Sequence, residues 1–180
     1  DPFTQTTRKT TLITLICDIE TDNLIPKMTK AHCLSIGSEE LDDITLYADH
    51  DGYPPISEGL ERMRLADRLV FHNGVGFDYP ALCKLYGDDV LPREKIFDTL
   101  ILSRLIDPTL RGHSLSAWGQ RLGYEKSSYD DWSVFTEEMG VYCIRDVAVT
   151  QRLYQMLMSK VDVSLDDALR LEHDFAWVIS

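Results

Sequence analysis

The chain has 180 residues, 44% of them hydrophobic, and its 30 acidic and 18 basic side chains give a net charge of −12. This length and apolar content fit one globular domain with its own core. The charge disfavours non-specific binding to duplex nucleic acid, which depends on lysine and arginine contacts to phosphate. An acidic chain can still handle phosphate groups where its carboxylates hold divalent metal ions, because the ions reverse the local charge.

No apolar run reaches the ~20 residues of a membrane-spanning helix, and no signal peptide is visible, so we expect a soluble protein without a membrane partner. The first ten residues, 1–10, read as a tag or disordered tail outside the fold. The four cysteines are scattered and never in C-x-x-C spacing, which argues against zinc. Their apolar surroundings favour reduced, intracellular thiols.

The first half of the chain predicts mainly strands. Residues 11–17 form an apolar strand, a loop covers 22–30, and two further strands are expected at 31–37 and 43–48. After a turn-rich link at 49–55, residues 56–66 have helical periodicity, with Ile56, Leu60, Met63 and Leu65 facing inward. Residues 68–71 form a short buried strand that ends in the turn His72-Asn73-Gly74.

The second half predicts mainly helices. Helices are expected at 78–86, where Gly87 would end the element, from 98 to Pro108, at 114–122 and at 134–160, with a last helical segment from Leu165. Three sequential strands followed by helices and a further strand indicate an α/β domain with a mixed sheet.

The strand end DIETDNL carries the first candidate site residues, Asp18 and Glu20. Ligand sites of α/β sheets tend to lie at the carboxyl ends of strands, and a spacing of two places both carboxylates on one face. On its own the pair is equally consistent with a solvated strand end.

Three further candidates come from two other segments. Asp78 follows the turn in VFHNGVGFDYPAL, where a carboxylate at a helix N-terminus is the ordinary alternative. Tyr142 and Asp146 lie four apart in YCIRD, a common pair on one helix face. Together, three Asp, one Glu and a phenol indicate a site for Mg²⁺ or Mn²⁺, since four acids gathered without cations would repel one another.

The order D-x-E, D, Y-x-x-x-D resembles the 3′–5′ exonuclease domain of the DEDD superfamily, in its tyrosine-containing subclass. DIETDNL resembles the first motif of that family, HNGVGFDYPAL the second and YCIRD the third. FDTLILSRLID, GHSLSAWGQRLG and the ending LEHDFAWVIS resemble the proofreading region of bacteriophage family A DNA polymerases. The resemblance implies a ribonuclease-H-like mixed β-sheet flanked by helices.

The resemblance also implies a mechanism. Two divalent ions, Mg²⁺ or Mn²⁺, would sit on the scissile phosphate of a DNA 3′ end and release nucleoside 5′-monophosphates. Asp18 would bridge both ions, Glu20 and Asp146 would complete the first, and Asp78 would hold the second through water. Tyr142 would orient the attacking water.

Contacts to substrate are implied for four residues, each with an ordinary alternative. Leu24 resembles a wedge between the last two bases, or is a core leucine that anchors its loop. Thr21 would contact the terminal 3′-OH. Asn73 would reach the terminal nucleotides, or stabilises its turn. Phe77 would stack on a base, although core packing is the favoured interpretation.

Other residues near these motifs favour structural interpretations. We expect His72 and His113 to be structural, Trp118 to pack in the core, and Asp98 to cap its helix.

The implied biological setting is the proofreading part of a phage-type DNA polymerase in the cytoplasm of an infected or bacterial host cell. The expected organisation is an exonuclease domain at 11–163 and, at 164–180, the start of a helix that leads toward a polymerase domain. Single-stranded DNA or a frayed DNA 3′ end would be the partner. Two alternatives stay open: a stand-alone exoribonuclease, and a catalytically silent scaffold that binds nucleic acid or a partner.

Overall fold

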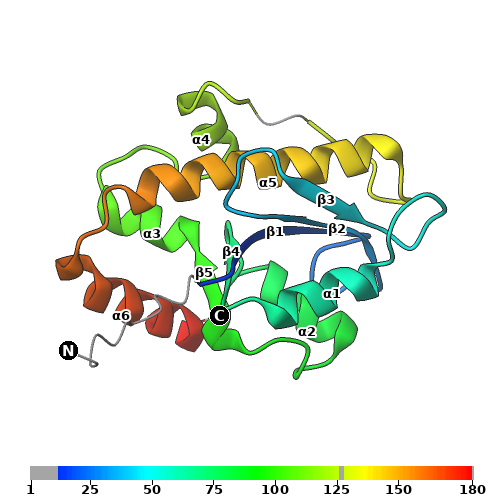
Figure 1. Cartoon of the computed structure of the whole chain (residues 1–180), viewed down its shortest axis with the longest axis horizontal. Helices are drawn as coiled ribbons and strands as arrows, with labels where there is room; N and C mark the ends of the chain where they lie inside the picture. The colour runs from blue at the N-terminus through cyan, green and yellow to red at the C-terminus, as the bar shows by residue number, and fades with distance from the viewer. Residues whose placement is uncertain (1–11, 126–127, 180) are drawn as a thin grey trace, which may run out of the picture.

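A mixed five-stranded sheet with helices on both faces forms the domain (Figure 1). The computed structural model describes residues 12–125 and 128–179. The N-terminal tail predicted at 1–10 lies outside the described residues. None of the described helices is long and apolar enough to cross a membrane.

The sheet has the strand order β3-β2-β1-β4-β5. Its strands are β1 (Thr14–Thr21), β2 (Ala31–Gly37), β3 (Ile44–Tyr47), β4 (Arg68–Phe71) and β5 (Ile96–Asp98). β1 pairs with β2, and β2 with β3, in antiparallel register, whereas β1, β4 and β5 run parallel. The carboxyl ends of these three parallel strands therefore meet at one edge of the sheet, as expected for a ligand site.

The helices match the sequence prediction closely. They are α1 (Ile56–Leu65), α2 (Asp78–Tyr86), α3 (Thr99–Ile106), α4 (Leu115–Arg121), α5 (Glu137–Met158) and α6 (Val163–Ile179), with one 3₁₀ turn η1 (Arg93–Lys95). The turn η1 and strand β5 were not predicted, because three residues each are too few to show a period. Leu65, predicted to face inward, is 76% exposed because α1 ends at that residue.

The first strand is longer than its apolar run. β1 continues to Thr21, so Asp18 and Glu20 lie inside the strand, where Glu20 is paired opposite Cys33 of β2. Antiparallel pairing with β2 satisfies the backbone of this polar end, which the sequence pattern alone does not reveal.

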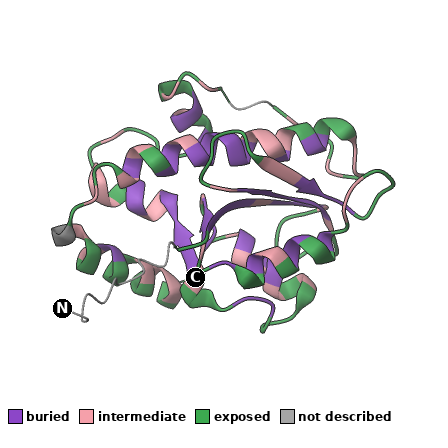
Figure 2. Cartoon of the chain, viewed as in Figure 1, coloured by how far each residue is buried: buried purple, intermediate pink, exposed green. Residues whose placement is uncertain are grey.

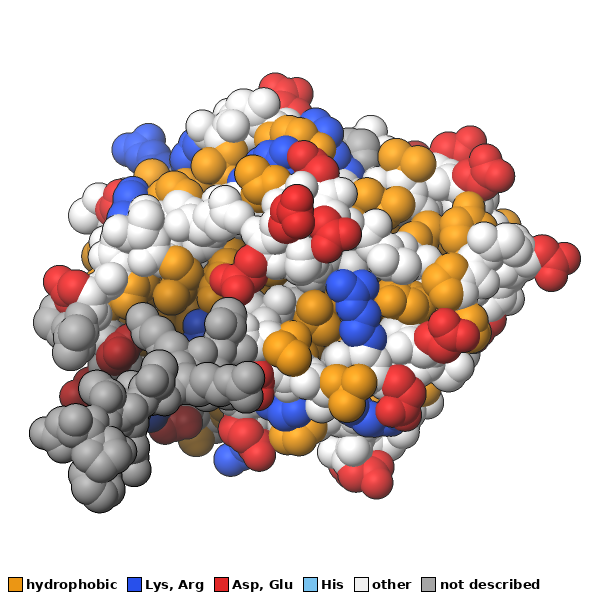
Figure 3. All heavy atoms as spheres, viewed as in Figure 1, with side chains coloured by type: hydrophobic (Ala, Val, Ile, Leu, Met, Phe, Trp, Pro, Cys, Tyr) orange, Lys and Arg blue, Asp and Glu red, His pale blue; other side chains and the backbone are white. Residues whose placement is uncertain are grey.

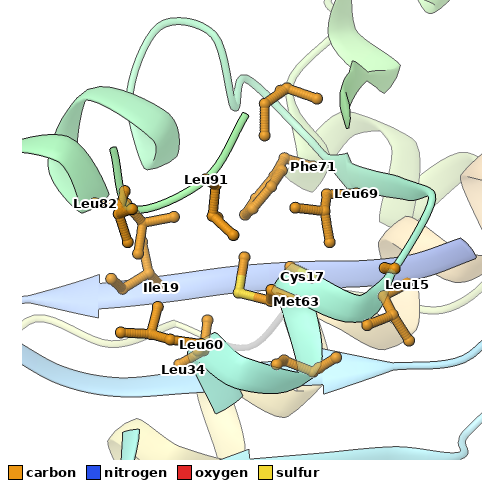
Figure 4. Packing of buried hydrophobic residues seen from close by; sticks show 14 of the residues in the cluster. Leu15, Cys17, Ile19, Leu34, Leu60, Met63, Leu69, Phe71, Leu82 and Leu91 are labelled. Carbon is orange, nitrogen blue, oxygen red and sulfur yellow. The ribbon is translucent and has the colours of Figure 1, made fainter. Parts of the chain in front are cut away.

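Side chains of β1 alternate between two cores. Leu15, Cys17 and Ile19 pack against α1 and α2 on one face of the sheet (Figure 4). Ile16 faces the opposite way, into the cluster built by α3, α4 and α5. Figure 2 shows the strands buried between these layers while the outer helix faces are exposed. Asp18 and Glu20 share the parity of Ile16, so their carboxylates point to the α5 side of the sheet.

Candidate metal centre

Asp18 and Glu20 form the centre of an acidic cluster at the end of β1. The register of pairing with β2 shifts between Glu20 and Thr21 at this point. Glu20 is only 9% exposed. Burial, and then the charges of Asp18 and Asp146, raise the pKa of Glu20 to about 11. Burial and the neighbouring carboxylates therefore both favour the protonated form of Glu20.

Asp78 adds a third carboxylate to the cluster from the start of α2. It is the first residue of α2 and is buried. The backbone N–H groups of Ile19 and Asp78 itself donate to its carboxylate, but burial and then the charges of Asp18 and Asp98 raise its pKa well above the ordinary value. Asp78 therefore does lie at a helix N-terminus, the ordinary alternative named in the sequence analysis. The same position also places its carboxylate beside Asp18.

The long helix α5 supplies the remaining two residues. Thr136 caps it, accepting a hydrogen bond of 3.1 Å from the Met139 N–H. Asp146 is buried at 3% exposure, and Tyr142, one turn earlier, is half-buried. A cleft of about 650 Å³ is lined by Asp18, Glu20, Asp78, Tyr142 and Asp146 together, so the structure brings all five predicted residues to one place.

The donor set fits a hard divalent cation. Four carboxylates supply the oxygen ligands that Mg²⁺ and Mn²⁺ prefer. None of the described residues that line the cleft is Lys or Arg. A carboxylate oxygen of Asp18, a carboxylate oxygen of Glu20 and the Sγ of Cys143 all lie within 4.8 Å of one another. A cation here would relieve the repulsion that raises the pKa of Glu20 and Asp78.

The turn that precedes Asp78 is fixed from β5 by a single carboxylate. Asp98, 1% exposed, accepts hydrogen bonds from the N–H groups of Asn73 at 2.9 Å, Val75 at 3.1 Å and Leu100 at 2.9 Å. The predicted helix cap is therefore confirmed through the Leu100 bond, and Asp98 also ties the turn to α3. His72 joins this arrangement through its Nδ1, 2.9 Å from the Thr99 hydroxyl.

Leu24 lies at the rim of the cleft. It is 69% exposed, so its interpretation as a core leucine is wrong. Met28, 2% exposed, anchors this loop instead. Thr21 also lines the cleft, but its hydroxyl donates to the Asn23 carbonyl at 2.9 Å, so that proton is engaged within the loop.

Asn73 and Phe77 line the cleft from the β4–α2 turn. Asn73 has a left-handed backbone with φ 70°, and its carbonyl accepts from the N–H groups of Gly76 and Phe77, as its turn-stabilising interpretation requires. Its side chain is close to Gly76, where an added Cβ would approach the Asn73 Oδ1 to 2.6 Å. Phe77 is half-buried at the cleft wall, so it is not a fully buried core residue, and stacking on a base stays a prediction.

Trp132 is a cleft residue that the sequence analysis missed. Its ring meets Tyr142 edge-on, with centroids 5.5 Å apart and planes at 78°. His32 of β2 holds the loop, with its Nε2 2.9 Å from the Trp132 carbonyl oxygen. The one available signal was a tryptophan among polar residues in YDDWSVF, and nothing local shows that it turns toward the cleft.

Two predicted structural residues lie outside the cleft. Trp118 is 8% exposed and its indole N–H donates to the Ser103 hydroxyl at 2.9 Å. The same hydroxyl lies 2.6 Å from Nδ1 of His113. The structural interpretations of Trp118 and His113 are confirmed by these contacts.

Sequence comparisons relate the chain to phage DNA polymerases. No family model matches the chain. The sequence is 32% identical, over 225 aligned positions, to the DNA-directed DNA polymerase of Enterobacteria phage T3 and 30% identical to that of Escherichia phage T7. Each match covers 92% of this chain but 32% of the polymerase, so the chain spans about a third of the length of these curated relatives.

Solved nuclease structures share the fold. An apo nuclease superimposes with a TM-score of 0.67 at 19% identity, covering 92% of this chain and 83% of the nuclease. Brucella melitensis NrnC with bound Mg²⁺ superimposes with a TM-score of 0.66 at 22% identity, covering 91% and 79%. The fold is therefore the ribonuclease-H-like fold of these nucleases, and the chain is homologous to part of phage DNA polymerases.

Proposed function

We propose that this chain is a metal-dependent 3′–5′ exodeoxyribonuclease of the tyrosine-containing DEDD class, and the proofreading part of a phage-type DNA polymerase. The observation that carries the proposal is the convergence of four acids and one phenol, from β1, α2 and α5, on a single cleft. The homology to phage polymerases and the nuclease fold support it.

The carboxylates would share the work of holding two Mg²⁺ or Mn²⁺ ions. Such ions supply a water of lowered pKa and stabilise charge on the leaving oxygen. Asp18 would contribute to holding both ions, because its charge acts on both Glu20 and Asp78. Asp146 acts on Glu20, so these two would complete one ion, while Asp78 would hold the other.

Tyr142 would hold the attacking water through its hydroxyl. Its ring is fixed on two sides, by Trp132 at 5.5 Å and by Tyr129 at 6.0 Å between centroids. A phenol fixed in this way, one helical turn from Asp146, is oriented before substrate arrives and loses little freedom on binding. The hydrolysis would then release nucleoside 5′-monophosphates.

The cleft favours an unpaired strand end over a duplex. Its apolar walls come from Leu24, Phe77, Leu115 and Trp132, and bases stack on or wedge against such surfaces regardless of sequence. The view in Figure 3 shows Lys and Arg side chains interspersed with acidic and apolar ones. In this proposal the grip on duplex DNA comes from a polymerase region in the same natural chain.

A paired digestion tests the choice of substrate. A 5′-labelled DNA strand with an unpaired 3′ end and an RNA strand of the same sequence would be incubated with the protein in Mn²⁺. We expect a ladder that shortens from the 3′ end and forms faster on DNA. Faster loss of RNA would favour the exoribonuclease alternative, and metal binding without cleavage of either strand would favour a silent scaffold.

A further inference from the structure

Cys143 lies directly beneath the acidic cluster. It follows Tyr142 on α5, is fully buried, and packs in a small apolar group with Cys33, Leu46, Ala48 and Met139. Its single S–H proton is shared between two oxygens of Asp18, with Sγ 3.5 Å from Oδ2 and 3.6 Å from the backbone oxygen. These separations are ordinary for a sulfur donor, whose atomic radius exceeds that of nitrogen or oxygen.

Cys33 of this apolar group is paired opposite Glu20 on β2, so the group joins α5 to the strand that borders the acidic cluster.

We propose that Cys143 is a positioning residue, whose S–H bond holds the Asp18 carboxylate in the orientation that binds divalent metal. The inference rests on the proposed function for the role of Asp18 as a metal ligand. It assigns to α5 a second task beside the supply of Tyr142 and Asp146, namely orienting the carboxylate of β1.

A neutral donor suits this task better than a cation would. Lys or Arg at this position would neutralise Asp18 and compete with the metal for its oxygens. A thiol orients the carboxylate while leaving its full negative charge for the ion. Partners that orient metal ligands commonly change metal affinity by about 10–100-fold, and the weak S–H donor should lie at the lower end of that range.

Metal binding gives a direct test that does not depend on catalysis. Mn²⁺ would be titrated into the full chain and the free ion measured by electron paramagnetic resonance, for the wild type, Cys143→Ala and Cys143→Ser. Cys17→Ala is the matched control, because Cys17 is equally buried and adjoins Asp18 but packs on the opposite face of β1. Thermal unfolding without metal checks that each variant is folded.

We expect Cys143→Ala to raise the Mn²⁺ dissociation constant about tenfold, with Cys143→Ser between the two and Cys17→Ala unchanged. The serine variant keeps a donor, so it decides the matter if the alanine variant does not fold. Dissociation constants of Cys143→Ala or Cys143→Ser equal to the wild type, or an equal rise in Cys17→Ala, would overturn the proposal. Wild-type protein that binds no Mn²⁺ would instead refute the proposed function, and with it this inference.

Discussion

Replacing Glu20 by Gln should stabilise the metal-free protein at neutral pH. Glu20 is 9% exposed and its pKa is raised from 4.5 to about 11, chiefly by burial and then by Asp18 and Asp146. Between these two pKa values the folded protein retains a proton that the unfolded chain has released. The free energy of unfolding of the wild type therefore falls as pH rises, by about 1.4 kcal/mol per pH unit for this single group.

The change in stability follows from the pH range between the unfolded and folded pKa values of Glu20. Between about pH 5.5 and 7.5, the wild type should lose roughly 3 kcal/mol of stability through Glu20. Glutamine keeps the shape of the protonated acid and does not titrate, so Glu20→Gln should remove this slope. At pH 7.5 the variant should exceed the wild type by at most roughly 4 kcal/mol, the cost of keeping Glu20 protonated three units above its unfolded pKa.

Urea unfolding in EDTA at several pH values measures this directly. Glu39→Gln is the control, since it removes the same charge from an exposed loop position and should leave the slope unchanged. Saturating Mn²⁺ should flatten the wild-type slope, because the ion replaces the proton. An unchanged slope in Glu20→Gln, or wild-type stability that rises with pH, would refute the account of a repulsive buried cluster.

Three further substitutions probe the positioning of the site and its use. Asp98→Ala leaves three backbone N–H groups without their carboxylate and should lower the free energy of unfolding in urea by about 3–5 kcal/mol. Asp98→Asn should lower it less, and a loss below about 1 kcal/mol in Asp98→Ala would contradict the anchoring role of Asp98. Leu24→Ala should leave the unfolding midpoint unchanged but weaken binding of a single-stranded oligonucleotide by about 1–2 kcal/mol in a fluorescence anisotropy titration, because less apolar surface is buried against the bases. A large drop in stability would instead show that Leu24 packs in the core. Tyr142→Phe keeps the ring contacts and should retain Mn²⁺ affinity while lowering kcat at least about tenfold, and an unchanged kcat would remove the phenol from the mechanism.

Helices and strands could be predicted closely from the sequence where a turn or a helix-ending residue marks their bounds. The bounds of Arg68–Phe71 and Asp78–Tyr86 agree with the structure, because a turn or a glycine stop marks their ends. The end of β1 was placed four residues early, since Asp18 breaks the apolar run and the pairing with β2 that continues the strand is a tertiary feature. Leu65 was assigned inward by period alone, which cannot show that the helix ends there.

The candidate site likewise contains residues that local sequence predicts and residues that only the tertiary structure reveals. Carboxylates in a recognisable order could be selected from the sequence, and the structure gathers them in one cleft. The surroundings could not be predicted: Trp132 reaches the cleft through a loop held by His32, 100 residues away, and Cys143 meets Asp18 across 125 residues. Only the exposure of Leu24 in the structure could decide between its two interpretations, because a leucine in a loop has the same local pattern whether it anchors the core or faces solvent.

The central claim is that the carboxylate cluster acts through divalent metal on a DNA 3′ end. Its most direct test is digestion of a 5′-labelled, 3′-unpaired DNA strand in Mg²⁺ or Mn²⁺, beside EDTA and Asp18→Ala samples. The account predicts a ladder that shortens from the 3′ end in metal alone and is abolished in both controls. A ladder that persists in EDTA or in Asp18→Ala, or wild-type protein that leaves the strand uncleaved in Mg²⁺ and Mn²⁺, would contradict it.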